Sequence, residues 1–404
     1  MDCRDVPGCL MPGTSSAGCP VQRFCSWCED MKIAVTALMF CVASLLSLGM
    51  VILYSATMMG TSRLIIMQLI WAGIGLVACI ILAAMDERHL KKLAIPLLIG
   101  STILLGLVFL PGVGGWTNGA RRWLHFGGVN VQPSELAKIS LILAMAWYGD
   151  RYHRHMPTFL RGLAVPGVFI GGVIGLIFVE PDRGTSILMA LVCGTMLLVG
   201  GVRWRFVVPF ALLALVGLAA TLMNDHMRLT RLDGWLHPEA HKNGVGFQAY
   251  QGMLALGSGG LSGLGLGNGR QKLGFIPEHH TDFILAVVGE ELGLIATLLV
   301  VAAYVVIILC GLYITMRSHT PFGLILGTGL TFLIGFQAFI NIGVVTSTLP
   351  NKGLPLPFVS YGGSSLLMML AAVGLLLGLA RQSRAPEAVR EDHSGSDVFA
   401  PQLS

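Results

Sequence analysis

The chain has 404 residues, of which 54% are hydrophobic and only 12% are charged, and its mean hydropathy is +0.75. An ordinary soluble domain carries about 25% charged residues, so this composition excludes a mainly soluble protein. The net charge of +5 comes from basic residues that are scattered over many short polar segments, and such scatter does not favour nucleic-acid binding. We therefore expect one membrane domain with short tails and no nucleic-acid partner.

The first 30 residues differ from the rest, since they are polar and hold five of the nine cysteines. We interpret residues 1–30 as a variable N-terminal tail, and Met31 as a candidate start residue, because an apolar run begins directly after Lys32. The other four cysteines lie singly inside apolar runs, where a cysteine behaves as a small hydrophobic residue. Residues 31–384 form the predicted membrane domain, and residues 385–404 are a predicted disordered cytoplasmic tail.

Apolar stretches of the length needed to cross a bilayer, about 20 residues, recur along the whole domain. They predict an all-α polytopic membrane protein with about ten transmembrane helices. The predicted spans are residues 33–56, 64–85, 93–110, 135–148, 163–179, 185–200, 206–223, 283–316, 321–348 and 360–380.

Lysines and arginines follow the second, fourth, sixth, eighth and tenth spans, and the positive-inside rule makes these segments cytoplasmic. Among the segments that are then outside, four are unusual: residues 111–134, 180–183, 224–282 and 349–359. Connections in a compact domain are usually about 4–6 residues long. The large fourth extracytoplasmic loop, residues 224–282, is therefore a predicted functional segment.

Glycines predict close contacts in three places. They recur every fourth residue at positions 167, 171 and 175, and again at Gly323 and Gly327, a spacing that favours close helix packing. The glycine-rich run at residues 257–269 lacks the Gly-Lys-Ser/Thr ending of a nucleotide-binding loop. We expect it to be a re-entrant or surface-lying segment that approaches a neighbour closely.

Charged residues stand where the membrane makes them costly. Arg121 and Arg122 lie outside, against the positive-inside bias, as a pyrophosphate headgroup would require. Glu135 and Lys138 share one helix face at the outer end of the fourth span. The alternative is a local ion pair together with arginines that reach toward lipid headgroups.

Further acids lie near the outer boundary of the bilayer. Asp182 lies in a very short connection, where the alternative is a hydrated turn. Asp282 stands at the outer mouth of the eighth span, where the alternative is a helix N-cap. Glu290 lies eight residues further along, about 12 Å deeper in the bilayer, and acids at such a depth are functional by default. Lys352 adds an external cation in the last outer segment.

These outer groups suit a substrate that is partly lipid and partly anionic. One carboxylate could act as general base on a sugar hydroxyl, while cations or a divalent metal stabilise a pyrophosphate leaving group. Transport of the same lipid would need the same groups, so the residues alone leave an enzyme and a transporter open.

Seven motifs, which together extend across residues 31–384, resemble those of the SEDS family (shape, elongation, division and sporulation), which contains FtsW, RodA and SpoVE. They are GARRW at residues 119–123, QPSELAK at 132–138, EPDRGT at 180–185, GNGRQKL at 267–273, PEHHTDF at 277–283, GEELG at 289–293 and VSYGGS at 359–364. Residues 268–273 and 351–353 are more similar to the division-type than to the elongation-type members.

The resemblance implies a peptidoglycan glycosyltransferase that polymerises lipid II into glycan strands during septal cell-wall synthesis, with undecaprenyl pyrophosphate as leaving group. It implies a bacterial inner-membrane protein with its site facing outward at the septum. The implied partners are lipid II, membrane lipid, an FtsI-like class B penicillin-binding protein that crosslinks the product, and other division proteins. A divalent cation, Mg²⁺ or Mn²⁺ with unknown ligands, is the implied cofactor.

Carried over by motif, the resemblance makes Asp282 the catalytic residue that activates the acceptor hydroxyl. Glu290 and Gln132 are expected to be structural or cavity residues. The expected substrate-binding residues are Arg121, Arg122, Glu135, Lys138, Asp182, Lys352 and Ser360. Two alternatives stay open: a lipid II flippase, which predicts polar residues through the full membrane depth, and a scaffold, which would tolerate Asp282→Asn.

Overall fold

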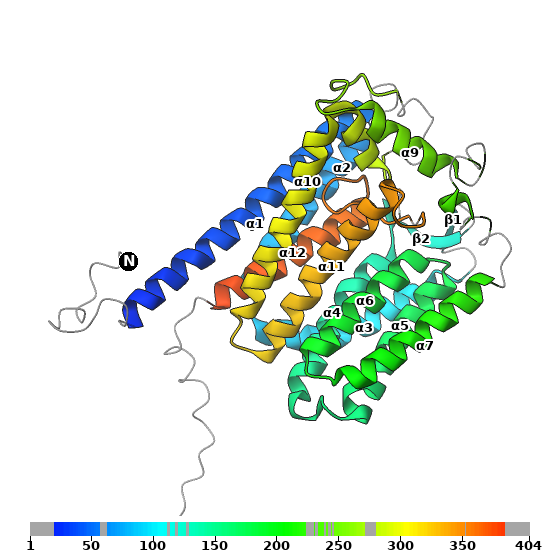
Figure 1. The fold of residues 1–404 in the computed structure, drawn as a ribbon. Helices are drawn as coiled ribbons and strands as arrows, with labels where there is room; N and C mark the ends of the chain where they lie inside the picture. Colours follow the sequence, from blue (N-terminus) through cyan, green and yellow to red (C-terminus); the bar gives the residue numbers. More distant parts are fainter. Residues whose placement is uncertain are drawn as a thin grey trace, which may run out of the picture.

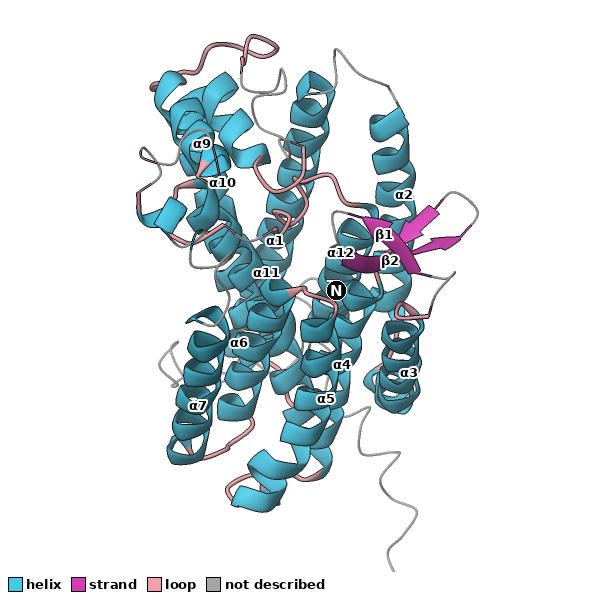
Figure 2. Ribbon diagram, turned by 90° about the vertical axis from the view of Figure 1, so that its right-hand side faces the viewer, coloured by secondary structure: helices cyan, strands magenta, loops and turns pink. Residues whose placement is uncertain are grey.

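The computed structural model describes residues 20–56, 63–110, 114–117, 120–126, 129–223, 230, 233–237, 240, 244, 246–270, 280–351 and 353–383. Long helices lie side by side in one bundle, and smaller elements gather in its upper half (Figures 1 and 2). The helices are α1 (Pro20–Ala56), α2 (Arg63–Ala84), α3 (Glu87–Leu107), α4 (Pro133–Arg151), α5 (Val165–Val179), α6 (Arg183–Val199), α7 (Trp204–Met223), α9 (Phe247–Ser258), α10 (Ile284–Met316), α11 (Pro321–Val345) and α12 (Gly363–Ser383).

Each of the ten predicted spans coincides with one of these helices, α1–α7 and α10–α12. Within the described part of the chain, seven helical segments are long and apolar enough to cross a membrane, and α6 and the first half of α7 are shorter apolar helices. The predicted class, a polytopic α-helical membrane protein, is confirmed. The count of ten crossings stays a prediction, because α4 carries charged residues at both ends.

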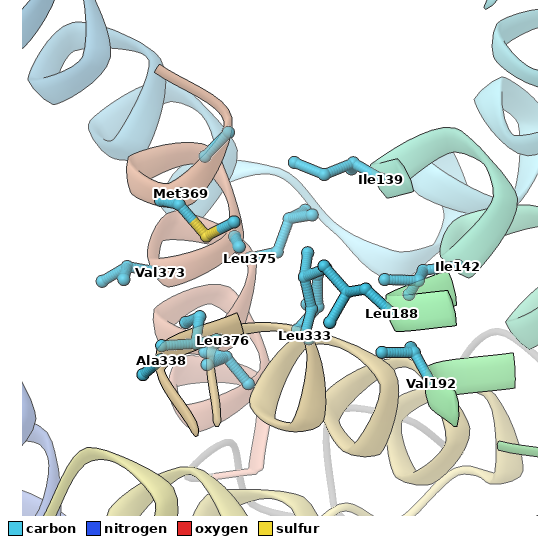
Figure 3. Close-up of a cluster of buried hydrophobic side chains, with 14 of the residues drawn as sticks. Ile139, Ile142, Leu188, Val192, Leu333, Ala338, Met369, Val373, Leu375 and Leu376 are labelled. Atoms are coloured by element: carbon cyan, nitrogen blue, oxygen red, sulfur yellow. The ribbon is translucent and has the colours of Figure 1, made fainter. Parts of the chain in front are cut away.

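The centre of the bundle is formed where α4, α6, α11 and α12 meet (Figure 3). Ile142, Leu188, Leu333 and Leu376, one from each of these helices, are fully buried. In the most apolar 18-residue stretch of α11 and of α12, more than two thirds of the residues are buried. In the corresponding stretches of α1, α2, α3 and α10, only about a quarter are buried. The peripheral helices therefore keep an apolar face turned outward, as a lipid surrounding requires.

The segments predicted to be cytoplasmic meet at one end of the bundle. Lys91 forms an ion pair with Asp150 at 2.7 Å, which joins α3 to the end of α4. Arg381 at the end of α12 forms another with Asp86 at 2.9 Å. The Thr320 hydroxyl, before α11, donates to the carboxylate of Glu87 at 3.0 Å. These contacts confirm that the predicted cytoplasmic segments share one side.

A small antiparallel sheet departs from the all-α prediction. Strands β1 (Gly114–Thr117), β2 (Ala120–Phe126) and β3 (Val129–Val131) pair in the order β1-β2-β3. They occupy a segment that we predicted only as a loop. The segment is rich in Trp and Val, which favour strands, and it lies beyond the helical spans where hairpin turns are possible.

The glycine predictions hold for one helix and fail for another. A side-chain carbon at Gly323 or Gly327 would collide with Ser318 or Thr315, so α11 does pack closely there. At positions 167, 171 and 175 of α5, no atom lies within 4 Å of such a carbon. The predicted packing role of the α5 glycines is therefore wrong, because that face of α5 borders open space.

Helix α10 is broken at Gly293, whose φ of 80° and ψ of −174° are not helical. The break separates an outer half, residues 284–292, from an inner half, residues 294–316. The glycine-rich segment at residues 259–270, here called the strap, lies directly against this break: Leu264 N donates to Glu290 O at 3.0 Å, and Leu294 N donates to Gly260 O at 2.9 Å. The predicted close approach of the glycine-rich run is confirmed.

We predict that Gly293→Ala lowers the free energy of unfolding by about 3 kcal/mol, because alanine resists a positive φ and its Cβ would meet the strap backbone. Thermal unfolding in detergent measures this. The control is Gly167→Ala, a helical glycine with open space beside it, which should be neutral or stabilising by up to about 1 kcal/mol. Equal losses in both variants would contradict the prediction.

Candidate functional site

Parts of all four predicted outer segments meet at the end of the bundle opposite the Lys91–Asp150 ion pair. Arg122 in β2 donates from Nη2 to Pro181 O at 2.7 Å, across the connection between α5 and α6. Tyr361 N donates to His280 O at 3.0 Å, which joins the last outer segment to the end of the fourth loop. The predicted site residues whose side chains are described therefore lie toward one end of the molecule.

Asp282 lies just before α10, and the position that caps this helix is Phe283, so the N-cap alternative for Asp282 is wrong. The backbone around Asp282 is held by three donors. Tyr361 N donates to the carbonyl of His280, the Ser360 hydroxyl to that of Thr281, and Asn341 Nδ2 to that of Asp282 at 2.8 Å. The Asp282 side chain itself is half-buried. Its backbone is thus fixed, while the residue as a whole stays partly exposed.

The Asp282 carboxylate lies beside Gly353 in the last outer segment. A side-chain carbon at Gly353 would be only 2.7 Å from Asp282 Oδ2. Gly353 therefore leaves room for the carboxylate at the surface of the protein. The neighbouring Lys352 lies outside the described residues, so its predicted role as a substrate cation remains a prediction.

Lys138 is a long, charged side chain that is only 1% exposed. Its Nζ forms an ion pair with Glu135 at 2.9 Å and donates to Gln337 Oε1 at 3.0 Å. Gln337 Nε2 in turn donates to Pro355 O at 2.9 Å. This line of contacts ties α4 to α11 and then to the last outer segment, and it confirms the predicted proximity of Glu135 and Lys138.

Two buried amides that we did not predict from the sequence complete this network. Gln337 and Asn341 lie four residues apart on α11, on the same helix face. Asn341 Nδ2 donates to both Asp282 O and Leu354 O, and its Oδ1 is buried without a hydrogen-bond partner among the described residues. The sequence did contain a signal for these residues, namely two amides four residues apart in an otherwise apolar span.

Ser360 and Gln132 use their polar groups within the protein. The Ser360 hydroxyl donates to Thr281 O and accepts from Leu356 N at 2.8 Å. Gln132 Nε2 donates to Asp182 Oδ2 at 3.3 Å. Ser360 therefore shapes the last outer segment around the site, and Gln132 links the outer end of α4 to the α5–α6 connection.

Asp182 is the N-cap of α6. Its carboxylate accepts from Thr185 N at 3.2 Å and from the Thr185 hydroxyl at 2.9 Å. Arg122 completes this corner, because its Nε donates to Glu180 O at 3.1 Å. Arg122 and Asp182 are thus brought together as predicted, and both hold the α5–α6 connection. The side chain of Arg121 lies outside the described structure.

Glu180 is a buried acid that we did not single out from the sequence. Its side chain is 1% exposed, and both carboxylate oxygens lack a hydrogen-bond partner among the described residues. Burial, together with the negative charge of Asp182, raises the pKa of Glu180 to about 8, against a smaller lowering effect of Arg122. Glu180 is therefore mostly neutral near pH 7.

Glu290 contacts the strap. Its Oε1 accepts from Arg270 N at 2.8 Å, and the side chain is 2% exposed. The next residue, Glu291, is fully buried and accepts from the Ser55 hydroxyl of α1. Both acids therefore connect α10 to neighbouring segments.

An apolar cavity of about 490 Å³ lies beside the polar residues. It begins at Gly184, next to Asp182, and at Leu349 and Pro350 of the last outer segment, and it extends between α6, α10 and α11. Its lining residues are Gly184, Ile187, Leu191, Ile308, Phe332, Gly335, Phe336, Phe339, Ile340, Leu349 and Pro350. The outer end thus joins a polar surface to a purely apolar space.

The described residues do not form a preassembled metal centre. Within the described ranges, no three His, Cys, Asp or Glu side chains are close enough to hold a metal ion. Glu180 and Asp182 are the two acids of the α5–α6 connection, and the Asp182 oxygens already accept hydrogen bonds.

We predict that Glu180 makes stability depend on pH. Its pKa of about 8 in the folded protein lies above the ordinary carboxyl value of 4.5, so its contribution is complete below about pH 4.5 and is lost as the pH rises to about 8. The melting temperature is measured at about pH 5 and about pH 9. It should fall less between these two pH values in Glu180→Gln, whose side chain cannot ionise, than in the unaltered protein. Identical decreases would exclude this role for Glu180.

Comparisons with known proteins agree with the motifs and the arrangement of the helices. A family model described as "Cell cycle protein", FTSW_RODA_SPOVE, matches residues 36–385. A protein of Geobacter metallireducens, named "Probable peptidoglycan glycosyltransferase FtsW", is 42% identical over 83% of this chain and 92% of its own length.

Two solved structures share the fold. One, of a peptidoglycan synthase complex that coordinates polymerization and crosslinking, is 30% identical with a TM-score of 0.74, and the match covers 86% of this chain and 97% of that one. The other, the rod shape determining protein RodA of Thermus thermophilus, is 29% identical with a TM-score of 0.65 over 85% of this chain and 96% of its own. The family match covers most of the chain, and the chain therefore belongs to the FtsW/RodA/SpoVE family of membrane proteins.

Proposed function

We propose that this protein is a peptidoglycan glycosyltransferase that polymerises lipid II at the outer face of the bacterial inner membrane during septal cell-wall synthesis. The observation that carries the proposal is the fixed backbone around the partly exposed Asp282, at the same end of the bundle as a buried cation network and the mouth of an apolar cavity. The name of the Geobacter relative supports the activity and the division role.

In the proposed reaction, Asp282 acts as general base. Its carboxylate accepts the proton of the acceptor GlcNAc 4-hydroxyl as that oxygen bonds to the anomeric carbon of the donor sugar. The bond between that carbon and the phosphate oxygen breaks, and undecaprenyl pyrophosphate leaves with the bonding electrons. Asp282 afterwards returns its proton to water, which its exposure on the outer side permits.

The leaving pyrophosphate needs positive charge nearby. Arg121, Arg122 and Lys352 are the candidate cations, as expected from the motifs, and Lys138 adds a buried positive charge at the outer end of α4. A divalent cation, when bound, would neutralise part of the pyrophosphate charge, and such ions are commonly held by substrate phosphates together with few protein ligands.

The apolar cavity fits the hydrocarbon tail of the same substrate. Its wall, formed by α6, α10 and α11, contains side chains such as Phe336 and Ile340 and leads away from the polar outer end. A lipid-linked sugar could therefore keep its headgroup near Asp282 while its tail stays in an apolar environment.

A flippase would need polar groups along the full depth of the membrane. Among the described residues, the buried ionisable acids and bases lie only toward the outer end: Glu135, Lys138, Glu180, Asp182, Glu290 and Glu291. The cavity below them is apolar. This distribution favours the enzyme over the transporter.

We also propose that a class B penicillin-binding protein works with this chain, with other division proteins nearby. The solved peptidoglycan synthase complex, in which polymerization and crosslinking are coordinated, supports such a partner. The partner would crosslink the strands that this protein makes.

We predict that Asp282→Asn lowers polymerisation by about 100-fold or more, because an amide cannot accept the proton. Gel detection of glycan strands, with purified protein, its penicillin-binding partner, lipid II and a divalent cation, measures the effect. The matched control is Asp233→Asn, an exposed acid in the same outer loop, which should retain activity. Equal polymer from wild type and Asp282→Asn would remove Asp282 from the mechanism.

We predict different effects for single and paired changes at Lys138. Lys138→Met alone leaves Glu135 buried without its cation, a loss of about 3–5 kcal/mol of stability. The double variant Glu135→Gln/Lys138→Met should regain most of the folded yield but not the polymerase activity, because the cation is still missing. Melting temperature and glycan synthesis distinguish these effects, and a double variant with full activity would show that Lys138 serves stability alone.

A further inference from the structure

Glu290 and Glu291 are buried acids in a membrane helix, and the proposed reaction uses neither of them. We propose that Glu290 and Glu291 are positioning residues for Asp282, because they fasten the outer half of α10 to the strap and to α1. This inference rests on the proposed role of Asp282 as general base. In this proposal both acids influence Asp282 indirectly, by holding the backbone of α10 in place.

The break at Gly293 is the first step of the argument. An unbroken helix would fix the direction of residues 284–292 through its continuous hydrogen bonds. Gly293 has a non-helical backbone, so the outer half is separated from the inner half that packs in the bundle. This outer half is only about 13.5 Å long and carries Asp282 next to its outer end. Its orientation must therefore be set by contacts other than the helix itself.

The strap supplies the first of these contacts. Leu264 N and Gly265 N donate to the carbonyls of Glu290 and Glu291, each at 3.0 Å, and Leu294 N donates to Gly260 O at 2.9 Å. These are the backbone groups that the break leaves without partners inside α10. In hydrocarbon such groups must form their hydrogen bonds within the protein. The break in α10 is therefore stable only because the strap supplies these hydrogen bonds.

The two carboxylates complete the attachment. Glu290 Oε1 accepts from Arg270 N at the end of the strap, at 2.8 Å. Glu291 accepts from the Ser55 hydroxyl of α1, with Oε1 at 2.8 Å and Oε2 at 2.6 Å. Gly269 lies against both acids, since a side-chain carbon there would be within about 3 Å of each. The inner end of the outer half is thus fixed on two sides.

The other end of this half-helix is fixed by the donors to residues 280–282, namely Tyr361 N, Ser360 and Asn341. A short helix that is held at both ends has one position. Loss of the attachment at Glu290 or Glu291 would let it tilt about the remaining end and would move Asp282 relative to the substrate. A misplacement of about 1 Å can reduce a rate by on the order of 100-fold.

The test compares variants that remove the attachment with one that preserves it. Glu290→Ala removes the acceptor of the Arg270 N hydrogen bond, and Ser55→Ala removes the donor to Glu291, whereas Glu290→Gln retains an oxygen that can accept from Arg270 N. The control is Glu87→Ala, which removes a carboxylate that also accepts a hydroxyl bond, from Thr320, but at the opposite end of the bundle. Each variant is purified as full chain with its penicillin-binding partner, and kcat and KM for lipid II are measured.

We expect Glu290→Ala to lower kcat by about 10- to 100-fold with KM changed by less than about twofold, since the substrate contacts remain and only the base is misplaced. Ser55→Ala should lower kcat in the same direction. Glu290→Gln should recover kcat to within about threefold, and Glu87→Ala should not alter it. Hydrogen exchange should increase at the amides of residues 264, 265, 294 and 295 in the Ala variants.

The inference is overturned if exchange shows that the strap is released while kcat stays at the wild-type value. It is also overturned if Glu290→Gln, folded and with a protected strap, is as slow as Glu290→Ala, because the carboxylate would then act by its charge. Asp282→Asn is measured in parallel. Full activity in that variant would remove the proposed base itself, whereas an inactive Asp282→Asn together with a fully active Glu290→Ala removes only the positioning role.

Discussion

Polar groups in the outer half of this bundle must find their partners inside the protein, because the surrounding hydrocarbon offers none. The requirement explains why Lys138 has both Glu135 and Gln337 as partners, and why α10 can break only where the strap lies against it. The same contacts connect segments that are far apart in the sequence. The hydrogen bonds and ion pairs that stabilise buried polar groups in the membrane therefore also hold the outer segments together.

One line of contacts leads from the centre of the bundle to the proposed base. It begins at Lys138 on α4 and passes through Gln337 to Pro355 in the last outer segment. From the adjacent Leu354 it returns through Asn341 to Asp282. Because α11 is largely buried, the amides that it contributes are held firmly, and Asp282 is placed relative to the bundle core although it belongs to a long external loop.

The helices and the grouping of the loops could be predicted from the sequence, because apolar length and the positions of Lys and Arg are strong signals. The clustering of Arg122, Glu135 and Asp182 also followed from their shared outer position. The role of Asn341 could not be predicted, since an amide in an apolar span does not reveal which carbonyls it will meet. The open space beside the α5 glycines and the break at Gly293 depend on neighbours distant in the sequence, which local spacing does not identify.

Burial separates the outer acids into two groups with different chemistry. Glu135 is buried and forms an ion pair with Lys138, and the buried Asp182 and Glu291 accept hydrogen bonds from partners within the protein. Glu180 is buried without such partners, and its raised pKa of about 8 keeps it mostly neutral near pH 7. A general base must be ionised, must reach the substrate and must return its proton to water after each turnover. Of the acids in the family motifs whose side chains are described, Asp282 alone combines a fixed backbone with an accessible carboxylate, which is the physical reason to assign the proton transfer to it.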